Sequence, residues 1–240
     1  MKYLRGSTLS VILKRLRSGN AEFREKYPLS RLLQMFMRVC NGVAFAHSME
    51  VCHFDLKPGN IHCGEYGEVQ VIDWGLSGDA ASGGPGEMKG TPGYMAPELV
   101  SGSKKAGKAA DIYALGCILY AILTLDSPLA GLPRQEILRR TVSGRIAPPS
   151  LSGRHFPPGL EAVCQKAMAL DPADRYVSAV EMRQDVNAAL SGYAAAAEQA
   201  SPVRTVFLFL RRNISEVAIV ILLLVSAVFA YLAFHFYTQN

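Results

Sequence analysis

The sequence predicts a mainly α-helical domain with a small β-hairpin, followed by one transmembrane helix. Apolar residues recur at helical spacing over several stretches, which is typical of helices that bury one face. A short run of β-forming residues, Val69–Ile72, follows a turn that contains glycine. Near the C-terminus, Val217–Phe234 carries no charge over 18 residues. As a helix it would measure roughly 27 Å, close to the hydrocarbon thickness of a bilayer.

The N-terminal part is expected to be helical. Its first residues, Met1–Leu9, lack the charged and then apolar pattern of a signal peptide. Ser10–Arg17 predicts a short helix, and the polar stretch 18–28 predicts an exposed loop. Ser30 is placed to cap the next helix. The buried face of that helix is predicted by the spacing of Leu32, Met35, Phe36, Val39, Val43 and Ala46.

The middle of the chain contains the hairpin, a flexible stretch and an apolar helix. Residues 61–63 and 69–72 predict the two hairpin strands. The segment 75–93 is rich in glycine and serine and predicts a mobile loop. Residues 111–123 are apolar on nearly every side but too short to cross a bilayer, so we predict a buried central helix. Asp111 stands at its start, where a carboxylate suits the helix dipole.

The next part predicts short helices and then a linker. We expect loops over 128–158 with a short helix around 134–143, and an amphipathic stretch over 159–170. Ser178 and Glu181 form a capping box that opens the last helix of the domain, which runs to about Leu190. Residues 192–202 are mostly Gly, Ala, Ser and Pro and predict a linker.

The charge-free stretch near the C-terminus predicts a membrane anchor. Ile214 and Tyr237 extend it at the two interfaces. A buried core helix is the alternative, which we disfavour because the preceding domain already looks complete at its C-terminal end. No Lys or Arg follows the span, whereas three arginines precede it: Arg204, Arg211 and Arg212. The positive-inside rule therefore predicts a single-pass protein of the inner or plasma membrane with its domain in the cytoplasm.

Charge and cysteine usage exclude some classes of function. The formal net charge of +5 is modest, and no basic run is interleaved with aromatic residues, so we expect no nucleic-acid partner. Five scattered cysteines without a C-x-x-C pair predict a reduced protein without a disulfide framework. Cys52-His53 and His62-Cys63 offer four potential zinc ligands, but another motif explains this region better.

Four polar residues close in sequence point to phosphoryl transfer. Such chemistry needs a carboxylate that orients a hydroxyl and accepts its proton, and an ammonium that offsets charge on the moving phosphoryl group. A second carboxylate and an amide oxygen would hold Mg²⁺. Each residue alone has an ordinary turn or surface interpretation. Within about two dozen residues, the sequence brings together Asp55, Lys57, Asn60 and Asp73.

The segments that carry these residues resemble two protein kinase motifs. Residues 53–60 read H-F-D-L-K-P-G-N and are similar to the kinase catalytic loop H-R-D-L-x-x-x-N. Residues 73–75 read D-W-G and are similar to the metal motif D-F-G. The resemblance implies ATP and Mg²⁺ as cofactors, with these roles: Asp55 as catalytic base, Lys57 on the transferred phosphate, and Asn60 and Asp73 as Mg²⁺ ligands.

Further residues match the kinase pattern in the expected order. Residues 90–98, G-T-P-G-Y-M-A-P-E, resemble the close of an activation segment. By this resemblance Thr91 lies near the catalytic base and favours a hydroxyl substrate. Glu98 is expected to be buried and to pair with Arg175. The resemblance also implies that Asp111 holds the backbone of the catalytic loop.

The chain departs from the kinase pattern at three positions. Phe54 replaces an arginine that normally pairs with a phosphorylated activation loop, so we do not expect that switch here. Trp74 replaces phenylalanine and keeps a bulky apolar ring. His62 takes the place of an apolar residue that forms the floor under adenine, which is expected to weaken nucleotide binding. His53 keeps the structural role that the resemblance implies.

The resemblance covers the large lobe of a bacterial, receptor-like serine/threonine kinase. We expect the lobe over 1–191, a linker and basic juxtamembrane segment over 192–213, and the span over 214–237. Nothing before His53 offers the glycine-rich loop, the lysine or its glutamate partner that cover ATP. We expect this small lobe to lie upstream or to come from a partner chain, and the chain to be inactive without it.

Three functions remain open from the sequence. The first is a kinase that transfers the γ-phosphate of ATP to Ser or Thr of a protein substrate. The second is a membrane-anchored pseudokinase that acts as a scaffold, which Phe54 and His62 favour and the four intact polar residues disfavour. The third is a remnant without a stable fold.

Overall fold

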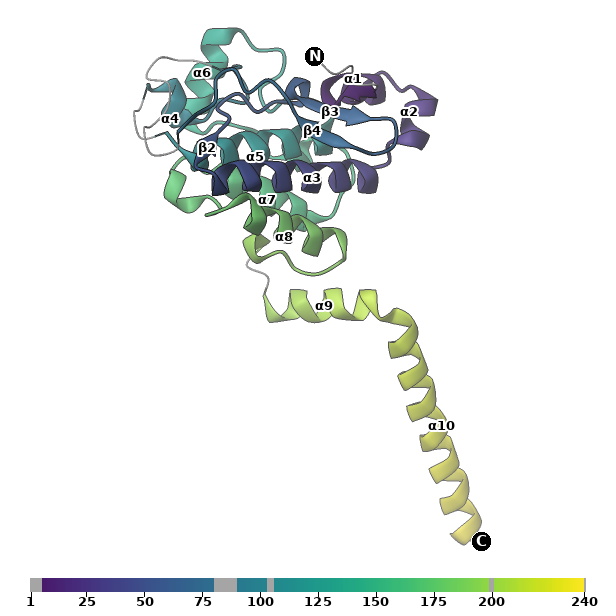
Figure 1. Cartoon of the computed structure of the whole chain (residues 1–240). Coiled ribbons are helices and arrows are strands. Elements are labelled where there is room, and N and C mark those ends of the chain that lie inside the picture. Colours follow the sequence, from purple (N-terminus) through teal and green to yellow (C-terminus); the bar gives the residue numbers. More distant parts are fainter. Residues whose placement is uncertain (1–5, 80–89, 103–105, 199–200, 240) are drawn as a thin grey trace.

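The computed structural model describes residues 6–79, 90–102, 106–198 and 201–239, and it confirms a mainly helical fold with a small antiparallel sheet (Figure 1). The helices of the lobe are α1 (Leu9–Arg17), α2 (Ala21–Lys26), α3 (Leu29–Ser48), α4 (Pro97–Val100), α5 (Lys108–Thr124), α6 (Arg134–Ser143), α7 (Pro158–Ala167) and α8 (Ala179–Leu190). Two helices follow the lobe, α9 (Pro202–Arg212) and α10 (Ile214–Gln239). Short 3-10 turns are η1 (Pro58–Asn60), η2 (Pro149–Ser152), η3 (Pro172–Asp174) and η4 (Ala196–Glu198).

The first helices differ in part from the sequence prediction. The helix at 10–17 is confirmed, and it begins one residue earlier, at Leu9. The predicted loop at 18–28 is wrong, because Asn20 accepts a hydrogen bond from the Phe23 amide at 3.0 Å and starts α2. The predicted cap at Ser30 is also wrong, since α3 begins at Leu29, after Pro28, and Ser30 lies inside its first turn.

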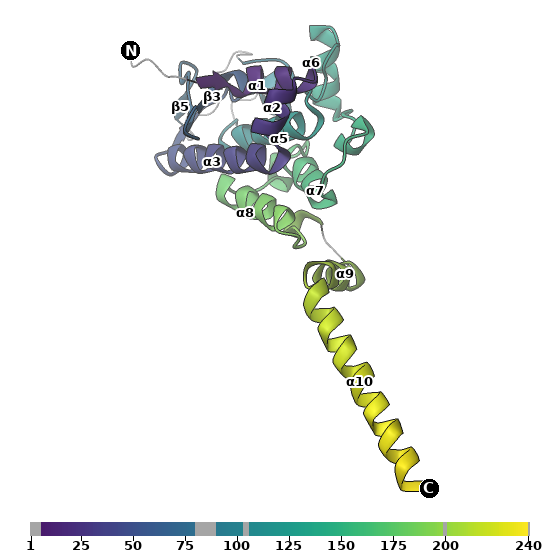
Figure 2. The same cartoon turned by 90° about the vertical axis from the view of Figure 1, so that its right-hand side faces the viewer.

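The predicted core face of α3 packs against the centre of the lobe. Its apolar positions are buried as expected, except that Ala46 is only half-buried. The central helix α5 is buried along almost its whole length, as predicted. It contacts α3 and α7, while α8 contacts both α3 and α7, so these four helices form the body of the lobe (Figure 2).

Gly116 allows α5 and α7 to approach each other closely. A Cβ atom at position 116 would lie 2.7 Å from Met168 Cγ and 2.9 Å from Ala167 Cβ. We expect Gly116→Ala to lower the free energy of unfolding by about 1–3 kcal/mol, because overpacking forces the two helices apart. Urea unfolding of the detergent-solubilised chain, followed by circular dichroism, measures the change.

Gly42 provides the matched control for that substitution. It lies on the exposed side of α3, where an added Cβ would meet Val71 Cγ2 at an ordinary 3.8 Å. Gly42→Ala should therefore raise the free energy of unfolding by about 0.5–1 kcal/mol through helix propensity alone. Equal shifts of the same sign in both variants would contradict the packing argument.

The sheet lies over the N-terminal side of the lobe. The predicted hairpin is confirmed as β3 (Ile61–Gly64) and β4 (Val69–Val71), with Ile61 opposite Val71. A third strand that the sequence analysis did not predict, β1 (Gly6–Thr8), pairs antiparallel with β3 on its other edge. A separate pair joins β2 (Val51–Cys52) to β5 (Gly78–Asp79). Strand β2 ends directly before the loop that contains Asp55, and strand β3 begins directly after it.

The segment after α8 continues to pack on the lobe. Asp185, in α8, accepts hydrogen bonds from the Ala196 and Ala197 amides at 2.8 and 2.9 Å and from the Tyr176 hydroxyl at 2.8 Å. Burial and this bond to Asp185 raise the pKa of Tyr176. The first part of the expected linker therefore adds to the base of the lobe.

The capping box predicted for α8 forms only in part. The Ser178 hydroxyl accepts from the Glu181 amide at 3.2 Å, as the motif requires. The Glu181 carboxylate, however, accepts from the Val177 amide at 3.1 Å, one residue before the cap. The amides of Val177 and Glu181, at the start of α8, therefore both have a hydrogen-bond acceptor.

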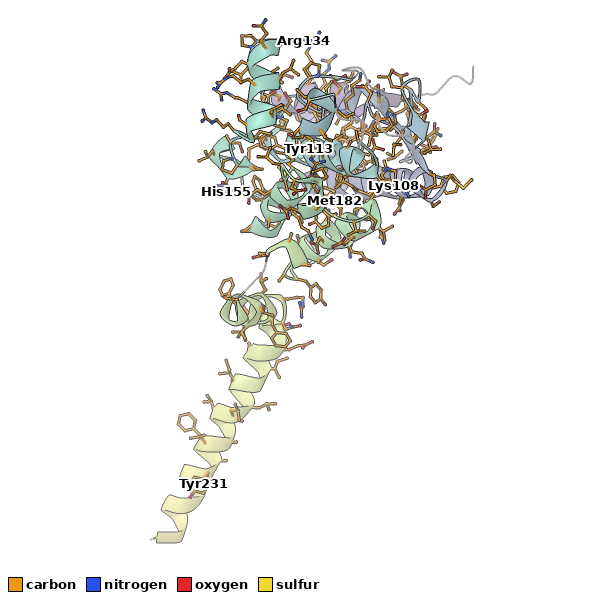
Figure 3. All side chains as sticks on the ribbon, turned by 90° about the vertical axis from the view of Figure 1, so that its left-hand side faces the viewer. Lys108, Tyr113, Arg134, His155, Met182 and Tyr231 are labelled. Carbon is orange, nitrogen blue, oxygen red and sulfur yellow. The ribbon has the colours of Figure 1, made fainter. Side chains whose placement is uncertain are left out.

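The last helix, α10, extends away from the lobe. Over 26 residues it is long and apolar enough to cross a membrane by length and composition, and it is the one such helix among the described residues. Figure 3 shows the contrast between Tyr113 and Met182, which are buried in the lobe, and Tyr231, which is exposed on α10.

All five cysteines are buried, and none of them forms a disulfide bond among the described residues. Burial raises the pKa of the Cys63 thiol to about 12.

Candidate active site

One buried carboxylate holds the backbone of the loop between β2 and β3. Asp111 is 1% exposed, and its two oxygens accept from the amides of His53 and Phe54 at 2.8 and 2.9 Å. Phe54 adopts a left-handed φ of 62°, which is uncommon for a bulky residue. The carboxylate compensates for that strain by giving two successive amides a common acceptor.

A histidine missed by the sequence analysis completes this support. His47, at the end of α3, lies 2.9 Å through its Nε2 from the Asp111 carboxylate. His47, Cys52 and Asp111 offer ligand atoms within 4.8 Å of one another. Asp111 already has three close donors, so the group is better described as a packed support than as a metal site. The only sequence signal for it is a lone histidine at a helix end.

His53 joins this loop to the strand that leads to Asp73. Its Nδ1 accepts from the Asp55 amide at 3.2 Å, so the ring proton lies on Nε2 and is donated to the Ile72 carbonyl at 3.1 Å. The ring also lies against that of Trp74, with centroids 4.6 Å apart. The histidine is fully buried and positions backbone on both sides of the site.

Three predicted site residues form one hydrogen-bonded set. Thr91 Oγ1 donates to Asp55 Oδ1 at 2.8 Å. Lys57 Nζ donates to the other carboxylate oxygen at 2.5 Å and to Thr91 Oγ1 at 2.8 Å. A hydroxyl, a carboxylate and an ammonium therefore meet in one place, although Thr91 lies 36 residues from Asp55. This arrangement can take a proton from an alcohol while compensating negative charge beside it.

Asn60 contacts that set, and its backbone is bonded to the residue before Asp73. The Asn60 amide nitrogen donates to the Asp55 carbonyl at 2.9 Å, which leaves the amide oxygen as its acceptor end. The Asn60 carbonyl accepts from the Ile72 amide at 2.9 Å, so Asp73 directly follows a residue bonded to Asn60. Asp73 is exposed with a left-handed φ of 62°. A carboxylate and an amide oxygen fit the ligand preference of Mg²⁺.

Glycine brings the segment that carries Thr91 against the loop. Gly90 has a φ of 129°, and a Cβ there would lie 3.3 Å from the Phe54 carbonyl oxygen. Residues 80–89 of the predicted mobile loop lie outside the described residues, as do residues 1–5.

Phe54, which stands where the motif has arginine, is part of an apolar cluster. It is 5% exposed and shares the cluster with Met95 and Tyr113. A Cβ on Gly78, in β5, would lie 3.3 Å from the ring. The Phe54 ring therefore contacts the residues of this cluster and of β5 through apolar packing, which needs no charged partner.

His62 lies in the middle strand of the sheet. It stands opposite Gln70 on one side and Thr8 on the other, and it is half-buried. Among the described residues, no hydrogen bond joins the His62 side chain to Asp55, Lys57 or Thr91.

The expected partners Glu98 and Arg175 form a bidentate ion pair. Arg175 donates to the two carboxylate oxygens at 2.7 and 2.8 Å. It also donates to three backbone carbonyls, of Ala109, Ala169 and Leu170. The pair joins α4, which follows Thr91, to the turn η3, so it fixes the closing end of the segment.

Comparison with known proteins identifies the family of the chain. The family model described as protein kinase domain matches residues 1–186. The chain is similar to the serine/threonine-protein kinase PknD of Chlamydia pneumoniae, with 35% identity over 219 residues. PknD of Chlamydia trachomatis serovar D is 36% identical over 222 residues. Both alignments cover 80% of this chain, which spans only 23% of the length of these relatives.

The family model covers most of the chain, and its range contains the loop at 53–60, the segment at 90–98 and the Glu98–Arg175 pair. The chain belongs to the protein kinase domain family.

Proposed function

We propose that this chain carries the phosphoryl-transfer site of a bacterial serine/threonine protein kinase. It moves the γ-phosphate of ATP to serine or threonine hydroxyls of a protein substrate. The observation that carries this proposal is the contact of Thr91 Oγ1 with Asp55 and with Lys57, each at 2.8 Å. A hydroxyl of the acceptor type already lies beside a carboxylate and an ammonium.

Asp55 is the catalytic base of this proposal. A substrate hydroxyl that takes the position of the Thr91 hydroxyl would donate to Asp55 Oδ1 within the distance that proton transfer needs. Lys57 bridges the same two residues, so its ammonium offsets negative charge on the phosphoryl group as it moves. Thr91 itself positions the segment that presents the substrate.

Asn60 and Asp73 would hold Mg²⁺ in this proposal. Held there, Mg²⁺ would supply positive charge that offsets the negative charge of the ATP phosphates. The inward hydrogen bond of Asn60 fixes its amide, and the link from Asn60 to Ile72 fixes the start of Asp73. His62 would contact the adenine side of the nucleotide, where a polar ring weakens the usual apolar contact.

We further propose that α10 anchors the lobe in the plasma membrane. The lobe occupies 1–191, the juxtamembrane part 192–213 and the span 214–237. The arginines before the span favour a cytoplasmic lobe. No glycine-rich loop occurs in the sequence before His53, and we propose that a small lobe completes the ATP site.

The test separates the base from the metal ligand. The chain is fused to the small lobe of a protein kinase and assayed with radiolabelled ATP, Mg²⁺ and casein. Asp55→Asn should lower the transfer rate by about 10²–10⁴-fold, because the general base is lost. It should leave unchanged the rise in melting temperature that Mg²⁺-ATP produces by binding the folded state. Asp73→Asn should abolish both transfer and that rise.

Asp174→Asn serves as the control, because this carboxylate is exposed on η3. It should change neither transfer nor nucleotide binding. Undiminished transfer in Asp55→Asn would refute the base assignment. A wild-type fusion that binds Mg²⁺-ATP without transferring phosphate would favour the alternative, a membrane-anchored scaffold.

A further inference from the structure

The helix that precedes the span exposes a row of large apolar side chains. In α9, Val206 is 57% exposed, Phe207 54% and Leu210 43%. Val206 and Leu210 are four residues apart and Phe207 and Leu210 are three apart, so the three share one side of the helix. A row of exposed large apolar side chains marks a surface that contacts a protein or a membrane.

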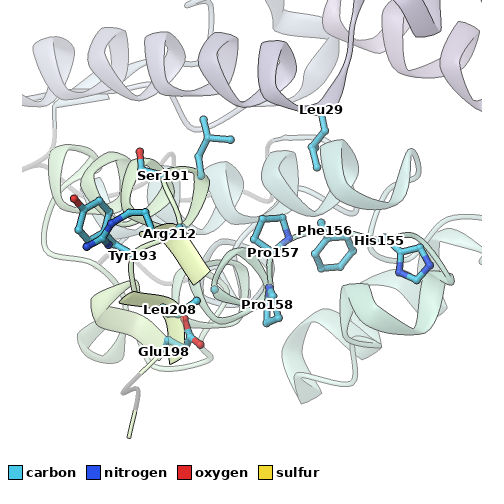
Figure 4. A pocket seen from close by; sticks show the side chains of 14 residues that line it. Leu29, His155, Phe156, Pro157, Pro158, Ser191, Tyr193, Glu198, Leu208 and Arg212 are labelled. Atoms are coloured by element: carbon cyan, nitrogen blue, oxygen red, sulfur yellow. The ribbon is translucent and has the colours of Figure 1, made fainter. Parts of the chain in front are cut away.

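The other side of α9 contacts the base of the lobe. Leu208 and Arg212, also four residues apart, both line a pocket of about 640 Å³ between α9 and the lobe (Figure 4). The Arg212 guanidinium lies 3.9 Å from the ring centroid of Tyr193, which follows α8 in the chain. The lobe side of that pocket is apolar in large part and includes Leu29, Phe156 and Pro158. Helix α9 therefore has one face against the lobe and one apolar face that is exposed.

Helix α10 indicates what covers the uncovered face. Only Asn213 separates α9 from α10. Figures 1 and 2 show α9 lying across the base of the lobe while α10 leaves it at a steep angle. If α10 crosses a bilayer, its first turn lies at the surface of that bilayer, and α9 has to lie along the same surface.

We propose that α9 lies in the membrane–water interface as an amphipathic helix and holds the base of the lobe against the lipid headgroups. This inference rests on the proposed span. Val206, Phe207 and Leu210 contact acyl chains, at a depth of about 5–10 Å below the headgroup boundary. Leu208 and Arg212 face the lobe. The sequence adds arginines at 204 and 211, and basic residues near an anionic surface strengthen membrane binding.

This geometry orients the active site. The sheet that borders the Asp55 loop lies on the side of the lobe away from α9 (Figure 1). A lobe held by α9 therefore presents its site toward the cytoplasm instead of toward the bilayer. Soluble substrates are then favoured over lipid-embedded ones.

The test measures depth in the bilayer with the full chain. Tryptophan is introduced in separate variants, Phe207→Trp, Leu208→Trp and Leu224→Trp, and the native Trp74 in the lobe serves as the background signal. Each variant is placed in bilayers of zwitterionic and anionic lipids. The lipids are brominated either near the headgroup end or near the methyl end of the chain, and bromine quenches tryptophan that it contacts.

We expect Phe207→Trp to lose most of its added emission with bromine near the headgroup end and much less with bromine near the methyl end. Leu208→Trp should lose little with either lipid, because it faces the lobe. Leu224→Trp should be quenched most by bromine near the methyl end, which reports the span itself.

The outcomes separate this inference from the proposed anchor. If Leu224→Trp is quenched and Phe207→Trp is not, the span stands and the interfacial helix is refuted. A blue-shifted but unquenched Phe207→Trp would show that protein, such as a second copy of the chain, covers this face, and it would also refute the inference. Equal quenching at 207 and 208 would refute the contact with the lobe. Absence of quenching at 224 would refute both the span and the inference.

Discussion

Replacing Asp111 by alanine should lower the free energy of unfolding by about 3–5 kcal/mol, the range observed when one partner of a buried charged contact is removed. The carboxylate is 1% exposed and accepts from the amides of His53 and Phe54. Its removal leaves both amides, and Nε2 of His47, without an acceptor in a place that water does not reach. Each such donor costs about 1–3 kcal/mol. Urea unfolding followed by circular dichroism, in detergent, measures the loss.

Two further variants make this result specific. Asp174→Ala removes an exposed carboxylate and should change the free energy of unfolding by less than about 0.5 kcal/mol. Asp111→Asn keeps one acceptor oxygen and should lie between the wild type and alanine. If Asp111→Ala is as stable as Asp174→Ala, the amides of the loop have other acceptors and the support is misassigned.

The same substitution should also affect the site. Phe54 holds a left-handed φ next to Asp55, and the amides bound to Asp111 are its own and that of the preceding residue, His53. Without the carboxylate the loop relaxes, and the distance from Asp55 to Thr91 is no longer fixed. Phosphoryl transfer should therefore fall even at temperatures where the lobe remains folded.

Sequence patterns predicted the elements that bury an apolar face. Helices α3 and α5 were found because burial imposes a regular spacing of apolar residues. Helix α2 was missed because none of its six residues is buried. Its one clear signal is Asn20, whose side chain caps it. Strand β1 was missed because it exists only through pairing with β3, from which it is distant in sequence.

The residues of the candidate site could be named from the sequence, but their contacts could not. Asp55 and Lys57 are neighbours in a motif whose residue types fit one reaction. The position of Thr91 depends on the path of a segment that contains Gly90 and on the fixed end at Glu98. The role of His47 depends on the start of a helix 64 residues later. Such contacts arise from the fold and leave no local pattern.

The ion pair between Glu98 and Arg175 carries the second large effect. The Arg175 side chain is fully buried and the Glu98 side chain is 12% exposed. Arg175→Ala should lower the free energy of unfolding by about 3–5 kcal/mol, because it leaves a largely buried carboxylate without its cation. Three backbone carbonyls, of Ala109, Ala169 and Leu170, lose a donor as well.

Lysine at position 175 distinguishes geometry from charge. It keeps the positive charge but cannot donate to two carboxylate oxygens and three carbonyls in one plane. Arg175→Lys should therefore recover only a small part of the loss. If lysine restores most of the stability, charge alone holds the segment, and the planar fork of hydrogen bonds adds little.

A double-mutant cycle then isolates the pair itself. Glu98→Gln and Arg175→Met are measured singly and together, and residues in direct contact should show a coupling energy of about 0.5–3 kcal/mol. The two residues are 77 positions apart and meet only in the folded lobe. The pair closes the segment that starts near Thr91, so its loss should also loosen the contact between Thr91 and Asp55. Additive single effects, with transfer unchanged, would show that the pair neither couples these elements nor supports the site.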